Sequence, residues 1–405
     1  MRVLHTADWH FGRTLEGRSR LEEQIAFVDE LVGIARDEAI DLVLLAGDVY
    51  DTVNPPAAAE QLFYDALSRL ADGGRRTVAV IAGNHDQPER VAASSPLAER
   101  SGIRLVGLPA AEPLRIGVAS TGEEAVVAAL PYPSEARLRE LLTEDTDEGR
   151  LRSAYSERVG RLMARLGGFF RPDTVNLAMS HVYVLGGDEC DSERPIQVGG
   201  AYTVDPSALR IGAQYVALGH LHRPQRVHRS DTMRYSGSPL AYSFSEANQA
   251  KSVVVFDAAP GAQVEPREIL LSCGKPVVKW KAAGGIAEVY RWLDEGKDAR
   301  AWIDLEIAMT ELITLEQIAQ LRKLHDGILH IRPVYPEREG EAAGASAARE
   351  QLPVDEMFRR FYIRQTGGAE PDEETLRIFL ELIAEDEGMD EAFAAEETAE
   401  RGRGA

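Results

Sequence analysis

The feature of this sequence that most constrains its fold is a series of five short polar motifs, each placed directly after an apolar segment. Five of the nine histidines lie in these motifs, which are Asp8-Trp9-His10, Gly47-Asp48-Val49-Tyr50-Asp51, Gly83-Asn84-His85-Asp86, Ser180-His181 and Gly219-His220-Leu221-His222. The preceding segments are short and apolar, as strands buried on both faces are. Because ligands bind where the carboxyl ends of parallel strands meet, we expect the five motifs to converge at one edge of a layered fold.

An alternation of strand-like and helical segments predicts an α/β domain over residues 1–275. Apolar residues at helical spacing predict helices over Leu21–Glu38 and Ala57–Leu70. Strands are predicted over Arg2–Thr6, Asp41–Ala46, Thr77–Ala82, Ala125–Leu130, Thr174–Met179, Gln214–Leu218 and Ser252–Asp257. Strands and helices in this order pack as layers around a shared core.

The residue types in the motifs favour divalent metal ions. Carboxylate and amide oxygens bind hard cations, and imidazole favours Mn²⁺, Fe²⁺ or Zn²⁺ over Ca²⁺. The motifs hold six or seven candidate ligands, more than the four that a structural zinc takes. They suit two ions about 3.5–4 Å apart that share a carboxylate, activate a hydroxide, orient a phosphate and stabilise the leaving oxygen.

Taken singly, each motif has a simpler interpretation. An Asp-x-His pair can be a loop cap, and Gly83-Asn84-His85-Asp86 is rich in residues that form turns. His181 alone is expected to be an ordinary core or surface histidine, and the same is expected of His5, inside the first strand. The ordered occurrence of all five motifs after apolar segments favours the metal centre.

The charge and hydropathy of the chain narrow the class of protein to which it can belong, but they do not exclude a protein that binds DNA. The net charge of −21 opposes nucleic-acid binding, but acidic residues are concentrated at 140–148 and 336–405, and bound metal ions would add positive charge. No run of about 18 apolar residues occurs, so we expect no membrane span. We also expect no secretory signal. With only two cysteines, Cys190 and Cys273, a cytoplasmic location is expected.

Beyond residue 275 the sequence predicts further parts. Residues 276–335 follow the order β-α-β-α-β of a small capping domain, and residues 336–350 have the composition of a flexible linker. Residues 351–387 contain two amphipathic helices, and residues 388–405 form an acidic tail that we expect to be disordered. The apolar faces of the helices hold Val354, Met357, Phe358, Phe361 and Tyr362, then Leu376, Phe379, Leu380 and Ile383. These faces indicate a partner site, with packing on the chain's own domain as the alternative.

The motifs resemble those of a known superfamily. The series D-x-H, GD, GNHD, H and GHLH resembles the calcineurin-like metallophosphoesterases over residues 1 to about 258. The segments HTADWHFGR, GDVYD and GNHDQPER resemble more narrowly the SbcD family, bacterial nuclease subunits that pair with the SbcC ATPase. This resemblance extends over nearly the whole chain. It implies a layered metallophosphoesterase β-sandwich flanked by helices, a small α/β capping domain and C-terminal partner-binding helices.

The resemblance also implies a role for each matched residue. The first metal ion would be held by Asp8, His10, Asp48 and His222, and the second by Asp48, Asn84, His181 and His220. His85 would be the general acid that protonates the leaving oxygen, oriented by Asp51 or Asp86. Some relatives carry histidine in place of Asp51, so the two orienting residues remain alternatives. Residues 182–200 match no assigned function.

The activity implied by the resemblance is that of a metal-dependent DNA nuclease with two divalent ions, Mn²⁺ being the expected cofactor. With the SbcC ATPase it would act as an ATP-dependent double-strand exonuclease and a single-strand and hairpin endonuclease in DNA repair, recombination and replication. The family assembles from two nuclease and two ATPase subunits. We expect the nuclease subunits to form a homodimer through the helix at Ala57–Leu70.

Two alternatives share the same metal site. The first is a phosphoesterase of the same superfamily that acts on nucleotides or other phosphoesters, for which residues 276–385 would be unnecessary. The second is a non-catalytic scaffold stabilised by its metals. The presence of all the ligands together with His85 argues against the scaffold.

Overall fold

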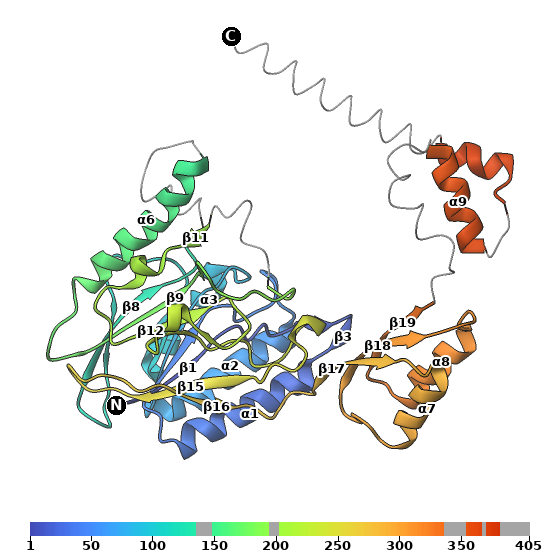
Figure 1. Cartoon of the computed structure of the whole chain (residues 1–405). Coiled ribbons are helices and arrows are strands. Elements are labelled where there is room, and N and C mark those ends of the chain that lie inside the picture. Colours follow the sequence, from blue (N-terminus) through green and yellow to red (C-terminus); the bar gives the residue numbers. More distant parts are fainter. Residues whose placement is uncertain (135–147, 194–201, 336–353, 367–369, 381–405) are drawn as a thin grey trace, which may run out of the picture. The chain divides into compact units, whose positions relative to one another are not determined.

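The structure is a computed structural model of the chain, and it describes residues 1–134, 148–193, 202–335, 354–366 and 370–380. The expected linker at 336–350, the expected tail at 388–405 and Ile383 lie outside the described residues. The chain divides into two compact units, Met1–Val334 and Tyr335–Ala405 (Figure 1).

Two six-stranded sheets form the centre of the first unit. The first, in the order β16-β15-β1-β4-β5-β6, contains β1 (Arg2–Thr6), β4 (Leu42–Ala46), β5 (Thr77–Ile81), β6 (Ile103–Val106), β15 (Ser252–Asp257) and β16 (Arg267–Leu270). The second, in the order β13-β14-β12-β9-β8-β7, contains β7 (Leu114–Gly117), β8 (Glu124–Leu130), β9 (Val175–His181), β12 (Tyr215–Gly219), β13 (Gln225–Arg226) and β14 (Met233–Tyr235). Strands β1, β4, β5 and β6 are parallel, as are β8, β9, β12 and β14.

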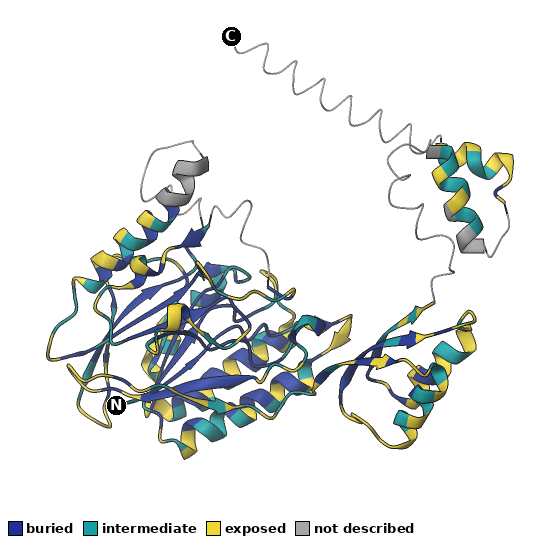
Figure 2. Ribbon diagram, viewed as in Figure 1, coloured by how far each residue is buried: buried dark blue, intermediate teal, exposed yellow. Residues whose placement is uncertain are grey.

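The two sheets pack face to face, and helices cover their outer faces (Figures 1 and 2). Helices α1 (Leu21–Asp37) and α2 (Ala57–Ala71) cover the first sheet, and α6 (Glu148–Gly167) covers the second. Strand β1 shows the consequence, because Val3 lies in the core between the sheets while Leu4 packs against the helices. Burial on both faces explains why these strands are continuously apolar.

The predicted fold class, a layered α/β sandwich flanked by helices, is confirmed. The seven predicted strands and both predicted helices are present, with bounds shifted by at most two residues. The prediction omits β6, β7, β14 and β16, which have only three or four residues each and so carry no readable pattern. It also omits α6, although Tyr155, Val159 and Met163 recur at helical spacing on its buried face.

A small α/β domain follows within the first unit. It consists of β17 (Val277–Ala282), α7 (Ile286–Asp294), β18 (Trp302–Ala308), α8 (Leu315–Leu324) and β19 (Ile328–Val334). Its strands form a parallel sheet with a separate core that includes Trp280 and Ile303. Thr314 and Gln317 form a capping box at the start of α8. The Trp302 indole N–H donates to Glu23 Oε2 at 3.1 Å, which joins this domain to α1.

The second unit contains two described helical segments, α9 (Val354–Thr366) and residues 373–380. Asp372 caps the second segment, since its carboxylate accepts the Thr375 N–H at 2.7 Å. The rings of Phe358 and Phe379 stack with their centroids 3.9 Å apart. The two apolar faces expected from the sequence therefore contact each other.

Short elements complete the described structure: β2 (Thr14–Leu15), β3 (Arg18–Ser19), β10 (Tyr183–Val184), β11 (Thr203–Val204), α3 (Pro88–Ala92), α4 (Ser95–Ala98), η1 (Asp72–Gly74), η2 (Glu99–Ser101), η3 (Pro206–Leu209), η4 (Val227–Arg229) and η5 (Phe244–Glu246). Among the helices described, none combines the length and apolar character that crossing a membrane requires. Cys190 and Cys273 both carry free thiols.

Candidate metal centre

The five motifs meet where the carboxyl ends of the two sheets come together. In the first sheet the neighbouring parallel strands β1, β4 and β5 lead into the first three motifs. In the second sheet the neighbours β9 and β12 lead into the last two. The structure thus brings together all seven expected ligands: Asp8, His10, Asp48, Asn84, His181, His220 and His222. All except Asn84 are buried.

One half of this cluster gathers around Asn84 and His181. Asn84 Oδ1 lies 2.8 Å from His181 Nε2 and 3.2 Å from His220 Nδ1. His181 Nε2 is also 3.4 Å from Asp48 Oδ2. The other ring nitrogen of His181, Nδ1, donates to the Ala46 carbonyl at 2.9 Å, which directs Nε2 into the cluster. Carboxylate, amide and imidazole atoms in one place suit a divalent transition metal.

The other half pairs His10 with His222. Their Nε2 atoms are 3.0 Å apart, and His10 Nε2 lies 3.6 Å from Asp48 Oδ2. Asp48 Oδ2 is therefore shared by both halves of the cluster, while Asp48 Oδ1 accepts the backbone N–H of His85 at 2.9 Å. Asp48 occupies the position that a bridging ligand needs.

Asp8 gives independent support for a cation at this place. Its Oδ1 accepts the backbone N–H of His220 at 2.9 Å. Its Oδ2 is buried and has no hydrogen-bond partner among the residues that the structure describes. A buried polar atom without a partner costs about 1–3 kcal/mol, and more when it is charged. A metal ion would satisfy this oxygen, so the donor set fits the two ions that the resemblance implies.

Burial and local charge set the protonation of the histidines. Burial lowers the pKa of His10 and His220 well below the usual value and that of His222 to about 4. These rings are neutral near pH 7, the form that binds metals. Burial acts in the same direction on His181, but the charges of Asp48 and Asp8 outweigh it and raise its pKa to about 9. A metal ion would compete with the extra proton on His181, so we expect metal binding to release protons.

The backbone of the motifs adopts conformations that few residues tolerate. Four ligands have positive φ angles: Asp8 (56°), His10 (46°), Asp48 (49°) and His220 (109°). Such conformations persist where the surroundings hold them, and they cluster at functional sites. Gly47 has a φ of 91°, and it also has no room for a side chain, because a Cβ there would lie 2.3 Å from His181 Nδ1. Only glycine lets the end of β4 pass this close to the His181 ring.

His85 lies at the margin of the cluster, fixed by the second motif. Its Nδ1–H donates to the backbone carbonyl of Asp51 at 2.7 Å, while the Asp51 carboxylate is 4.0 Å from the same nitrogen. Asp86, the other residue considered for orienting His85, accepts three backbone N–H groups of the second and third motifs at 2.8–3.1 Å. The contacts favour Asp51 as the orienting residue, through its carbonyl, and Asp86 as the residue that joins two motif loops.

The position of His85 allows a second role besides that of general acid. His10, Asp48 and His85 each offer an atom within 4.8 Å of the others, as do Asp8, Asp48 and His181. The ring centroids of His10 and His85 are 4.7 Å apart. His85 is therefore near enough to act as a metal ligand or as a proton donor, and the metal content of a variant distinguishes the two roles.

Residues outside the motifs, which sequence reasoning missed, hold His222 in place. Ser192 Oγ lies 2.7 Å from the His222 ring Nδ1, and Glu193 Oε1 accepts the His222 backbone N–H at 2.7 Å. Lys251 Nζ donates to the His222 carbonyl at 2.9 Å. Ser192 and Glu193 belong to the segment to which the sequence assigns no function. No periodicity or motif connects them with Lys251, so the signal exists only in the folded chain.

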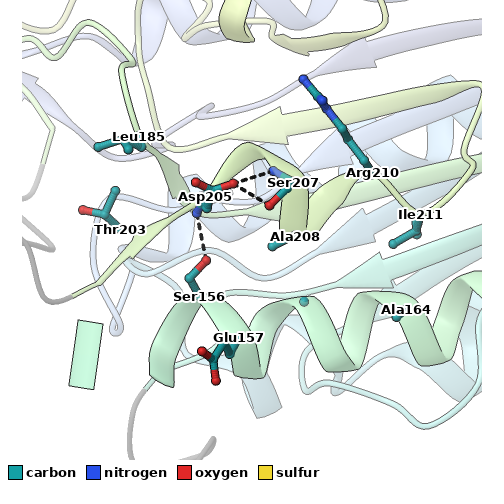
Figure 3. Close-up of a pocket in the computed structure, with 11 residues that line it drawn as sticks. Ser156, Glu157, Ala164, Leu185, Thr203, Asp205, Ser207, Ala208, Arg210 and Ile211 are labelled. Atoms are coloured by element: carbon teal, nitrogen blue, oxygen red, sulfur yellow. Dashed lines mark hydrogen bonds between the residues drawn. The ribbon is translucent and has the colours of Figure 1, made fainter. Parts of the chain in front are cut away.

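A cavity of about 370 Å³ opens beside His85. It is lined by Arg13, Thr14, Asp51, His85, Asp191, Ser192 and Glu193. A second cavity, of about 640 Å³, lies between α6 and residues 203–211, where Asp205 bonds to Ser156 and Ser207 (Figure 3). Within the described residues, none of the expected site residues lines this second cavity. We therefore place the chemistry at the smaller cavity, next to His85.

The expected partner-binding residues lie in the second unit. Phe358, Tyr362, Leu376 and Phe379 are half-buried, whereas Met357 and Leu380 are exposed. The backbones of Val354 and Phe361 are described, but their side chains, like the whole of Ile383, lie outside what is described. The stacking of Phe358 on Phe379 uses part of each apolar face, while Met357 and Leu380 remain exposed.

Comparison with known proteins identifies the family. Residues 1–224 match the calcineurin-like phosphoesterase family, and residues 273–366 match a family described as the type 5 capsule protein repressor C-terminal domain. The SbcD subunit of the SbcCD nuclease of Bacillus subtilis is 55% identical over 95% of this chain and 98% of its own length. This chain belongs to the SbcD family of calcineurin-like phosphoesterases. The protein of the same name from Rhodobacter capsulatus is 35% identical over 70% of this chain and 72% of its own length.

The phosphoesterase match includes the seven expected ligands and His85, and the second match includes the small α/β domain and all of α9. The chain is accordingly a hydrolase of phosphoesters, as the motifs predict. Among solved structures, TT1561 of Thermus thermophilus aligns with 66% of this chain and 98% of that chain, at 14% identity and a TM-score of 0.34. A superposition this loose is no basis for comparing site geometry.

Proposed function

We propose that this chain is the nuclease subunit of an SbcCD-type complex and that it hydrolyses DNA phosphodiesters with two divalent metal ions, with Mn²⁺ as the expected ion. The observation that carries the proposal is the convergence of seven ligand side chains beside His85 and a cavity. Two relatives named as nuclease subunits support a nucleic acid as the substrate class. The added small domain and C-terminal helices exceed what a nucleotide substrate requires.

The ligand side chains divide into two sets that share Asp48. Asp8, His10, Asp48 and His222 would hold one ion, and Asp48, Asn84, His181 and His220 would hold the other. When bound, the two ions would activate water and stabilise negative charge on the phosphate. The protein supplies a prearranged set of donors whose backbone and hydrogen bonds are already in place, so little reorganisation is needed when substrate arrives.

His85 and Arg13 are the residues that we expect to act on the substrate itself. The Asp51 carbonyl fixes His85 Nδ1, which leaves Nε2 as the nitrogen that donates a proton to the leaving oxygen. Arg13 lines the same cavity and brings a positive charge to the place where a phosphate would enter. This local charge offsets part of the overall acidity of the chain.

The proposed nuclease has the assembly and setting that the family suggests. An SbcC-type ATPase would bind the C-terminal helices, in a complex of two nuclease and two ATPase subunits that acts in the cytoplasm in DNA repair, recombination and replication. Ile25 on α1 and Tyr64 on α2 expose apolar surface, which supports a helix-mediated homodimer of nuclease subunits. Light scattering at micromolar concentration tests the homodimer, and a monomeric mass would count against it.

A cleavage assay with defined DNA tests the proposed reaction. The purified chain with Mn²⁺ should cut single-stranded DNA, and addition of the coexpressed ATPase with ATP should bring cleavage of duplex ends. A chelator should abolish both activities. Hydrolysis of nucleotides without hydrolysis of DNA would support the small-substrate alternative. A metal-loaded chain that cleaves neither substrate would be the scaffold.

A further inference from the structure

His222 differs from the other ligands in how its ring is held. His181 directs its Nδ1–H to a backbone carbonyl, that of Ala46. His222 Nδ1 instead meets a side chain, the hydroxyl of Ser192, at 2.7 Å. Ser192 is buried, and it comes from the segment 182–200 that neither the motifs nor the proposed mechanism uses.

The direction of the hydrogen bonds around Ser192 follows from its second partner. Ser192 Oγ lies 2.6 Å from Glu246 Oε1. The Glu246 carboxylate also accepts the backbone N–H groups of Tyr242 at 2.8 Å and Ser243 at 3.0 Å, and Lys251 Nζ at 2.5 Å. A carboxylate surrounded by donors can only accept, so the Ser192 hydroxyl donates to Glu246. The hydroxyl oxygen is then left to accept the Nδ1–H of His222.

This chain of contacts fixes the tautomer of the His222 ring. With the proton held on Nδ1, the lone pair of Nε2 faces His10 Nε2, 3.0 Å away, where the first metal ion is expected. Partners of this kind orient metal-binding histidines, and their loss typically lowers metal affinity about 10–100-fold. The buried pair of Glu246 and Lys251 anchors the far end, and Lys251 also donates to the His222 carbonyl.

We infer that Ser192 is a positioning residue for the first metal ion, acting through His222 and anchored by Glu246 and Lys251. This role rests on the proposed two-metal centre and adds to it a residue that acts through one of the expected ligands. Ser192 also lines the cavity beside His85, and its carbonyl accepts Arg13 Nη2 at 2.6 Å. The same residue thus connects the cavity wall with a ligand of the first metal.

The hydrogen bonds of Ser192 connect it with one proposed metal site and not with the other. Its described hydrogen bonds reach His222, Glu246 and Arg13, and none of them reaches Asn84, His181 or His220. Loss of the hydroxyl should therefore weaken the first site and leave the second unchanged. A residue that only supported the fold would weaken both sites.

Calorimetric titration of the full chain with Mn²⁺ tests the inference. Ser192→Ala should bind one ion as the parent does and the other about 10–100-fold more weakly. Ser192→Thr, which keeps the hydroxyl, should bind both ions as the parent does. Ser252→Ala is the matched control, because Ser252 is also buried but its hydroxyl has no partner among the described residues.

A double-mutant cycle assigns the weakened site to His222. In a His222→Ala background, Ser192→Ala should cause no further loss of Mn²⁺ affinity, because the ring on which it acts is gone. Additive losses, equal weakening of both sites, unchanged binding by Ser192→Ala, or a Ser192→Thr chain as weak as Ser192→Ala would each overturn the inference. A parent chain that binds fewer than two ions would overturn the two-metal proposal itself, and the inference with it.

Discussion

The metal centre and the C-terminal unit both carry side chains expected to act on something outside the chain, yet they are held in opposite ways. At the centre all the expected ligands except Asn84 are buried, and four of them have positive φ. In the C-terminal unit the apolar side chains are half-buried or exposed, and one aromatic stack, Phe358 on Phe379, joins the two helical segments.

The difference fits what each region is proposed to bind. Metal ions and a reacting phosphate require donors placed to within a fraction of an ångström, so the fold holds these groups in advance. A protein partner can complete a helical surface by itself, so the surface can remain open until the partner arrives. Changes at the centre should therefore remove chemistry, whereas changes in the C-terminal unit should remove assembly.

The largest expected effect comes from the carboxylate shared by both halves of the centre. Asp48→Ala removes the group that lies 3.6 Å from His10 and 3.4 Å from His181. We expect both ions to be lost or loosened and hydrolysis to fall below detection, while the fold survives. Elemental analysis, an activity assay and circular dichroism measure the three outcomes. Full activity with one ion or none would show that Asp48 is not the bridge.

His85 should have the next largest effect, confined to the reaction step. His85→Ala should keep both ions and bind DNA but lose about 10²–10⁴-fold in cleavage rate, the contribution typical of a general acid. His228→Ala, at an exposed histidine outside the cluster, is the control. If His85→Ala instead lost metal while the cleavage rate per bound metal ion stayed normal, His85 would be a ligand. Its distance from His10 and Asp48 also permits this role.

Gly47 tests how closely the centre is packed. Gly47→Ala should cost about 1–2 kcal/mol for its positive φ, and in addition it should weaken metal binding because the new Cβ meets His181. Gly17→Ala is the matched control, since Gly17 also has positive φ but nothing within 4 Å of an added Cβ. Thermal unfolding measures the loss of stability, and Mn²⁺ titration measures the loss of metal affinity. Equal metal binding by both variants would mean that the His181 ring can move.

The smallest effect on basal chemistry should come from the C-terminal unit. Truncation before Gln351 should leave a folded, metal-loaded chain that cuts single-stranded DNA or a simple phosphodiester with Mn²⁺. It should no longer co-purify with the ATPase or show ATP-stimulated cleavage of duplex ends. Pairing Met357→Asp with Leu380→Asp should do the same without removing the helices, since both side chains are exposed.

The control for the paired substitution is Glu373→Ala, another exposed change in the same unit. Unfolding of the truncated chain would show that the apolar faces are packed on the rest of the protein. A truncated chain that folds and still binds the ATPase would place the contact elsewhere. Substitution of Phe358 is less informative than substitution of Met357, because Phe358 also stacks on Phe379.

The sequence predicts which side chains come together at the candidate centre, because their positions depend on local order. Each motif follows a short apolar strand, and the edge of a parallel sheet brings such motifs together. No local sequence pattern identifies the residues that hold His222, because Ser192 and Glu246 are 54 residues apart in the sequence and come together only in the folded chain. Contacts made by backbone groups cannot be predicted from the sequence for the same reason. Asp51 is predicted by its side chain, whereas the contact with His85 uses its carbonyl.

The position of strand β1 has a consequence for how the enzyme is made. β1 pairs on one side with β4 and on the other with β15, which begins at Ser252. A chain emerging from the ribosome therefore exposes Asp8 and Asp48 long before β15 and the loop of His222 have been synthesised. Because domains fold as units during synthesis, the centre stays incomplete for most of translation. We therefore expect phosphoester hydrolysis to begin only when both sheets of the sandwich are complete.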